Sequence, residues 1–117
     1  MQNLLKFYRK NTSVIQVDAC DYQFNTGDTL YFTVKTAPDN DQSDSSALIK
    51  TNWVVGTDVT PDPYTNKLEL TLTEEQTDID FGDFFYDIKL VAAGDDGPGT
   101  TLVTGAITIM PVATLRA

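Results

Sequence analysis

The sequence predicts an all-β protein in which two sheets pack face to face, and three observations lead to this class. Apolar and polar residues alternate in several short segments, as half-buried strands require, because successive side chains point to opposite sides of a sheet. Turn-forming residues separate these segments at short intervals. No segment repeats its apolar residues over a long stretch with the period of an α-helix. We therefore expect about seven to eight strands in a single domain, residues 1–117.

The expected strands, in chain order, span residues 4–8, 14–17, 29–35, 47–55, 67–73, 83–90 and 102–110. The segment from Lys67 to Thr73 alternates most regularly, with every second residue a leucine. Between the strands we expect turns and loops. The polar, acidic segment 36–46 is predicted to be an exposed and mobile loop, and Pro61 and Pro63 mark a second loop because proline cannot donate to a sheet. Residues 112–117 are expected to form a short tail.

The segment from Asp80 to Leu90 is the centre of the predicted fold. Its four alternating apolar residues predict a strand with one buried face, and they are Phe84, Tyr86, Ile88 and Leu90. Upstream, Thr73-Glu74-Glu75-Gln76 has the Thr-x-x-Gln form of a capping box, which is enough for one helical turn. A strand, a short acidic turn and then Asp-x-Gly before an aromatic strand is how sandwiches of immunoglobulin type cross between sheets. The sequence thus predicts an immunoglobulin-like antiparallel β-sandwich.

Composition excludes several classes of function. Seventeen acidic and eight basic residues give a formal net charge of −9, and because nucleic acid binding depends on clustered lysine and arginine, we expect no nucleic acid partner. No apolar run is long enough to span a bilayer and no signal peptide opens the chain, so we expect no membrane partner and a cytoplasmic site of synthesis. There is no histidine, and Cys20 is the only cysteine, which removes imidazole triads, intrachain disulfides and thiolate metal cages.

Acidic clusters raise the question of calcium and of carboxylate catalysis. Three clusters are present: Asp39, Asp41 and Asp44; Asp78, Asp80 and Asp83; and Asp95 with Asp96. None has the order of an EF-hand loop ending in a bidentate glutamate, and acidic turns are commonly plain solvated turns. A glycosidase pair needs one carboxyl in apolar surroundings, whereas every acidic residue here falls in a loop or on a polar strand face. We expect no metal, no cofactor and no catalytic residue, and hence no enzyme.

The aromatic residues leave two interpretations open. Trp53 shares its parity with Ile49 and Val55, which predicts a core tryptophan; the alternative is a carbohydrate platform formed with Tyr31, Tyr64 and Phe85. Tyr31 and Phe85 take the outward parity of otherwise polar strand faces. An outward phenylalanine either meets a neighbouring subunit or is covered by a loop, and we favour the subunit contact.

Residues 1–10 form a candidate assembly arm. The segment from Leu4 to Tyr8 is apolar and free of carboxylates, with Lys6, Arg9 and Lys10 beside it. One hypothesis is that it joins a neighbouring subunit, by adding a strand or by packing Leu5 and Phe7 against it, while Lys6 and Arg9 meet acidic loops. The other is that residues 4–8 form the first edge strand of their own sandwich. The interface candidates are Leu5, Lys6, Phe7, Arg9, Tyr31 and Phe85.

Several segments together resemble the N-terminal domain of phage upper baseplate proteins and related small tail proteins of phages and prophages. They are Gly27-Asp28-Thr29 before Leu30-x-Phe32-x-Val34, Leu68-x-Leu70-x-Leu72-Thr73-x-Glu75, Phe81-Gly82-Asp83-Phe84-Phe85-Tyr86-Asp87-Ile88-Lys89-Leu90, and Gly105-Ala106-Ile107-Thr108-Ile109 before Pro111. The resemblance implies a non-enzymatic structural or assembly protein in the tail, baseplate or connector of a particle. Its partners would be further copies of itself and other phage structural proteins, and it would move from the host cytoplasm into the virion. The alternative is a small carbohydrate-binding β-sandwich module.

Overall fold

Alternating apolar residues build seven strands in the part of the chain that the structure describes. A computed structural model of the protein describes residues 3–18, 22–36, 47–62, 67–94, 97 and 99–111. The strands are β1 (Asn3–Tyr8), β2 (Ser13–Asp18), β3 (Thr29–Lys35), β4 (Ile49–Val54), β5 (Lys67–Leu72), β6 (Gly82–Val91) and β7 (Thr100–Met110). Each of the seven predicted segments overlaps one of these strands.

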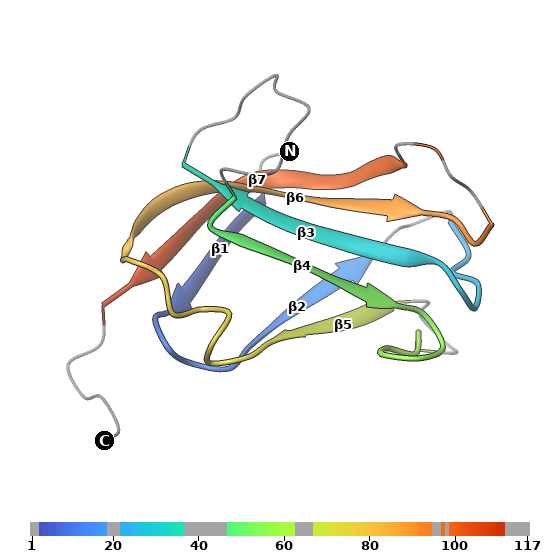
Figure 1. The fold of residues 1–117 in the computed structure, drawn as a ribbon, viewed down its shortest axis with the longest axis horizontal. Helices are drawn as coiled ribbons and strands as arrows, with labels where there is room; N and C mark the ends of the chain where they lie inside the picture. Colours follow the sequence, from blue (N-terminus) through green and yellow to red (C-terminus); the bar gives the residue numbers. More distant parts are fainter. Residues whose placement is uncertain are drawn as a thin grey trace.

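The strands form two sheets that enclose one core. The larger sheet has the order β1-β7-β6-β3-β4, and the smaller one pairs β2 with β5, as Figure 1 shows. Two packed sheets, with β7 and β6 paired beside β3 in the larger one, match the architecture of an immunoglobulin-like sandwich. The predicted immunoglobulin-like β-sandwich is therefore confirmed. One pairing departs from an antiparallel fold, because β1 runs parallel to β7 from Asn3, opposite Gly105, to Tyr8, opposite Met110.

The buried face of each strand is the one that the alternation predicts. In β6 the buried residues are Tyr86, Ile88 and Leu90, and the opposite strand β3 buries Leu30, Phe32 and Val34. The Phe32 ring of β3 lies between two other aromatic rings, 5.8 Å from that of Tyr86 and 6.3 Å from that of Trp53. Trp53 is only 8% exposed, so its prediction as a core residue is confirmed. Burial also raises the pKa of the Tyr86 phenol.

The turn between β5 and β6 carries the chain from the smaller sheet to the larger. The predicted capping box is present: the Thr73 N–H donates to the Gln76 side-chain oxygen at 2.9 Å, and the Gln76 N–H donates to the Thr73 hydroxyl at 3.2 Å. The Thr77 N–H donates to the Thr73 carbonyl at 3.1 Å, which closes one helical turn. The Gln76 amide also donates to the Thr51 hydroxyl of β4 at 3.0 Å, so the turn is tied to both sheets.

Asp28 joins three segments at one end of the sandwich. It is 1% exposed, and its carboxylate accepts hydrogen bonds from the Tyr22 hydroxyl at 2.7 Å and from the N–H groups of Asn25 and Ala93, each at 2.9 Å. Burial acts to raise the pKa of this carboxyl, but the three hydrogen bonds outweigh it and the pKa lies below its usual range. The bond to Asp28 in turn raises the pKa of Tyr22.

Some predictions concern residues that the structure does not describe. They are the mobile loop 36–46 apart from Thr36, the tail 112–117, Cys20, Pro63 and Tyr64, and the acidic residues Asp39, Asp41, Asp44, Asp95 and Asp96.

Candidate protein-interaction face

The N-terminal segment forms an edge strand of its own sandwich. This is the second hypothesis for residues 4–8; the first is that they join a neighbouring subunit. β1 pairs with β7 along its full length, and Phe7 is 7% exposed within the core. Leu5 is half-buried and packs against the same core. Both apolar side chains therefore pack within their own chain. Lys6 and Tyr8 have the opposite parity and are exposed on the outside of the sheet.

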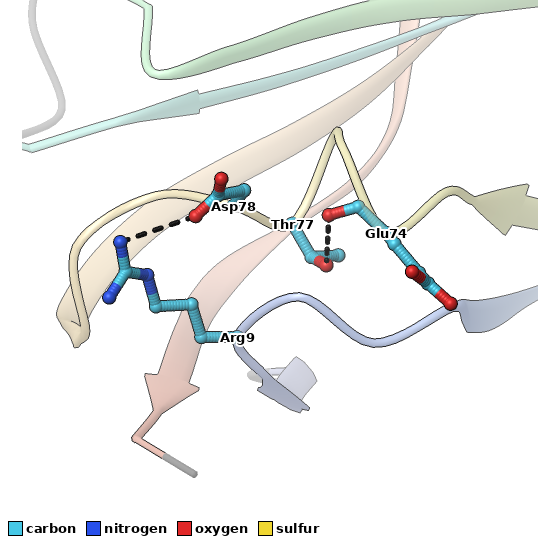
Figure 2. Close-up of polar contacts among 4 residues, drawn as sticks. All are labelled: Arg9, Glu74, Thr77 and Asp78. Carbon is cyan, nitrogen blue, oxygen red and sulfur yellow. Dashed lines mark hydrogen bonds and ion pairs between the residues drawn. The ribbon is translucent and has the colours of Figure 1, made fainter. Parts of the chain in front are cut away.

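Arg9 binds an acidic turn of its own chain, as Figure 2 shows. Its guanidinium lies 3.2 Å from the Asp78 carboxylate in the turn between β5 and β6. The same turn holds the following residues, since the Lys10 N–H donates to the Thr77 carbonyl at 3.4 Å and the Thr77 hydroxyl donates to the Asn11 carbonyl at 2.8 Å. The two side chains are 34% and 41% exposed, so the ion pair contributes at most about 1 kcal/mol. Within its own chain Arg9 therefore pairs with Asp78, and its role at an interface stays a prediction.

The outward side of the larger sheet, which we call the outer face, carries exposed aromatic rings. It consists of the outward-pointing side chains of β1, β7, β6, β3 and β4. Tyr31 is 41% exposed and Phe85 is 42% exposed, as their parity predicts, and Tyr8 is 50% exposed on β1. Phe85 lies opposite Lys35 of β3, and Tyr31 lies opposite Lys89 of β6, so each ring has a lysine on the adjacent strand.

Two more exposed apolar residues border the outer face. Phe81, which precedes β6, is 61% exposed, and Leu48, which precedes β4, is 40% exposed. The Leu48 N–H donates to the Val34 carbonyl at 2.7 Å, so it continues the pairing of β4 with β3. The alternation in the sequence does not single out Tyr8, Leu48 or Phe81 as exposed. Of the six large apolar side chains exposed in the described residues, only Val14 lies on the smaller sheet.

The outer face is basic although the chain as a whole is acidic. Four of the seven basic residues in the described ranges lie on it, namely Lys6, Lys35, Lys50 and Lys89. Two acidic residues share it, Asp83 and Asp87, and the Asp83 carboxylate accepts a hydrogen bond from the Thr108 hydroxyl at 2.8 Å. Among the described residues, the four positive and two negative charges give this face a net of +2, whereas all described residues together, seven basic and eleven acidic, give −4. The described part of this face is therefore net positive, and two of its lysines lie opposite Phe85 and Tyr31.

Other kinds of site find less support in the described residues. Trp53 is buried, so the ring that a carbohydrate platform would use is not available. Within the described ranges, no three histidine, cysteine or acidic side chains gather as a metal site would require. The same part of the chain contains no helix with the length and apolar character needed to cross a membrane.

Comparisons with known proteins show no family and only distant likeness to solved structures. No protein-family model matches the chain, and no curated protein matches it in sequence. Among solved structures, a heterodimer of the IG1 domains of ZIG-8 and RIG-5 aligns with 16% identity and a TM-score of 0.39, over 94% of this chain and 83% of that one. The extracellular domain of the voltage-gated sodium channel β4 subunit, solved as parallel homodimers, aligns with 13% identity and a TM-score of 0.34, over 97% and 93%. At TM-scores this low, the likeness carries no information on function.

Proposed function

We propose that the chain is a non-enzymatic assembly domain that binds further copies of itself through the outer face. The observation that carries the proposal is the set of three exposed rings, Tyr8, Tyr31 and Phe85, on one side of one sheet. Scattered exposed apolar residues are ordinary, but several on one face mark a contact surface.

The composition of the outer face suits a protein partner. Tyrosine and phenylalanine are enriched in protein interfaces because they bury a large area and lose little side-chain entropy. The rings project from β1, β3 and β6, three strands of a single hydrogen-bonded sheet. A contact made there needs little ordering on binding, which favours affinity. The lysines beside Tyr31 and Phe85 add charge that selects among partners.

The finer part of the proposal concerns where this domain acts. The resemblance to phage upper baseplate and tail proteins supports a place in the tail, baseplate or connector of a phage or prophage particle. In that setting the chain is synthesised in the host cytoplasm, assembles with copies of itself and with other structural proteins, and remains in the virion. Mass spectrometry of purified particles tests this part, and finding the chain only in the unassembled fraction would contradict it.

Sedimentation of the purified chain tests the contact itself. We expect the wild-type protein to associate as its concentration rises. Replacing two rings in the double variant Tyr31→Ser/Phe85→Ser, which we call the face variant, should weaken the association at least tenfold, because both aromatic contacts are lost. A matched control is Glu75→Ser, an exposed position in the turn between β5 and β6 that lies on neither sheet face. The control should associate as the wild type does.

Two outcomes would contradict the proposal. The first is a wild-type chain that stays monomeric at every concentration reached. The second is a face variant that melts like the wild type yet associates with unchanged affinity. Thermal melting of each variant separates a lost contact from a lost fold.

A further inference from the structure

The outward side of the smaller sheet differs from the outer face in charge and in shape. A shallow hollow lies there, which we call the acidic hollow; it is lined by residues 58–62 together with Gln16, Lys67 and Glu69. Gln16 and Glu69 lie opposite each other on β2 and β5 and point away from the core. Asp58, Asp62 and Glu69 supply three negative charges against the single positive charge of Lys67, so the hollow has a net charge of −2.

The two surfaces point in opposite directions. The inner sides of the two sheets meet in the core, so their outward sides are on opposite sides of the sandwich, as the separation of the β2–β5 pair in Figure 1 indicates. The hollow offers Val59 and Pro61 as apolar lining, and the exposed Val14 lies on the same side of β2. One side of the molecule is therefore basic with aromatic projections, and the other is acidic, hollowed and partly apolar.

We propose that the outer face of one copy docks into the acidic hollow of the next, so that copies stack head to tail. This inference rests on the proposed function and specifies its partner surface. Opposite charges, +2 on the outer face and −2 around the hollow, attract when the two meet. A symmetric dimer through two outer faces would bring two surfaces of net charge +2 together, and their repulsion disfavours it. A head-to-tail contact leaves one free surface at each end, and such contacts produce rings or open filaments.

Two variants that each remove one surface test the inference. The face variant Tyr31→Ser/Phe85→Ser removes the projecting rings and keeps the hollow. A hollow variant, Asp62→Lys/Glu69→Lys, reverses the charge of the hollow and keeps the outer face. We expect each variant alone to associate at least tenfold more weakly than the wild type. An equimolar mixture should form a species of two chains and nothing larger, because only one complementary pair of surfaces remains.

The control for charge is Glu74→Lys/Glu75→Lys, which changes the net charge by the same amount at exposed positions of the turn between β5 and β6. It should associate as the wild type does. Raising the salt concentration from about 50 to 500 mM should weaken wild-type association, since screening acts on contacts between charged surfaces.

The outcomes separate this inference from the proposed function. If the wild type associates and the face variant does not, but the mixture stays monomeric, the outer face binds something other than the hollow and the head-to-tail stack is contradicted. A hollow variant that associates as tightly as the wild type would also contradict the head-to-tail stack. If the wild type never associates, the proposed function fails together with the inference.

Discussion

A single carboxylate, Asp28, holds together one end of the molecule. Its three hydrogen-bond donors come from the segment before β3 and from Ala93, which is 65 residues further along the chain. The sequence predicts a turn at Asn25-Thr26-Gly27-Asp28, and the Asp28 N–H does donate to the Asn25 carbonyl at 3.0 Å. The sequence does not predict that the Asp28 side chain is buried, because these four residues form a turn in any surroundings. The contact with Ala93 depends on the tertiary fold.

The lowered pKa of Asp28 gives the stability of the protein a defined dependence on pH. The pKa of Asp28 is lower in the folded chain than in the unfolded chain, where it is 3.8. Ionised Asp28 therefore stabilises the fold at any pH above 3.8. This stabilisation is lost as the pH falls through the pKa that Asp28 has in the folded chain. We expect Asp28→Asn to reduce the free energy of unfolding by about 1.5–3 kcal/mol at pH 7, and by less below pH 4. Urea denaturation over this range measures the difference.

Asp80→Asn is the matched control for Asp28→Asn, because Asp80 is an exposed aspartate. Its effect should stay within about 0.5 kcal/mol at every pH. A loss for Asp28→Asn that is the same at pH 7 and at pH 3 would show that the shape of the side chain matters there rather than its charge.

The elements show how far alternation along the sequence can predict the fold. In β3, β5 and β6 it predicts which side chains are buried, because a strand at a sheet surface has one apolar side. It does not predict which strands are neighbours, since the same pattern suits any partner. The parallel pairing of β1 with β7 was therefore not foreseen, and neither was the internal contact of Arg9 with Asp78.

The burial of Phe7 predicts that β1 stabilises the fold. Phe7→Ala removes a ring that is 7% exposed, so we expect a loss of about 3–5 kcal/mol in the free energy of unfolding. Lys6→Ala, next to it but on the exposed side, should change stability by no more than about 0.5 kcal/mol. Equal effects of the two variants on the urea midpoint would mean that β1 is not held by the core and is free to join a neighbouring subunit.

The fold places basic residues on one side of the molecule and an acidic hollow on the other, which composition alone cannot reveal. A net charge of −9 predicts a solvated, acidic surface, yet the outer face of the larger sheet carries four lysines, two of them opposite Tyr31 and Phe85. The outward parity of those two rings could be read from the sequence. The positions of Tyr8, Lys6 and the acidic hollow could not, because they depend on which strands share a sheet and on how the segment 58–62 lies over β2 and β5.

Hydroxyl-radical footprinting of the wild-type protein tests the central claim most directly, because it reads the exposure of aromatic side chains without changing them. The protein would be oxidised at a concentration where it is monomeric and again where sedimentation shows association, with buried Phe24, which is 5% exposed, as an unreactive reference. We predict that oxidation of Tyr8, Tyr31 and Phe85 falls together on association. If these three rings are oxidised equally in both states, the outer face is not the contact surface.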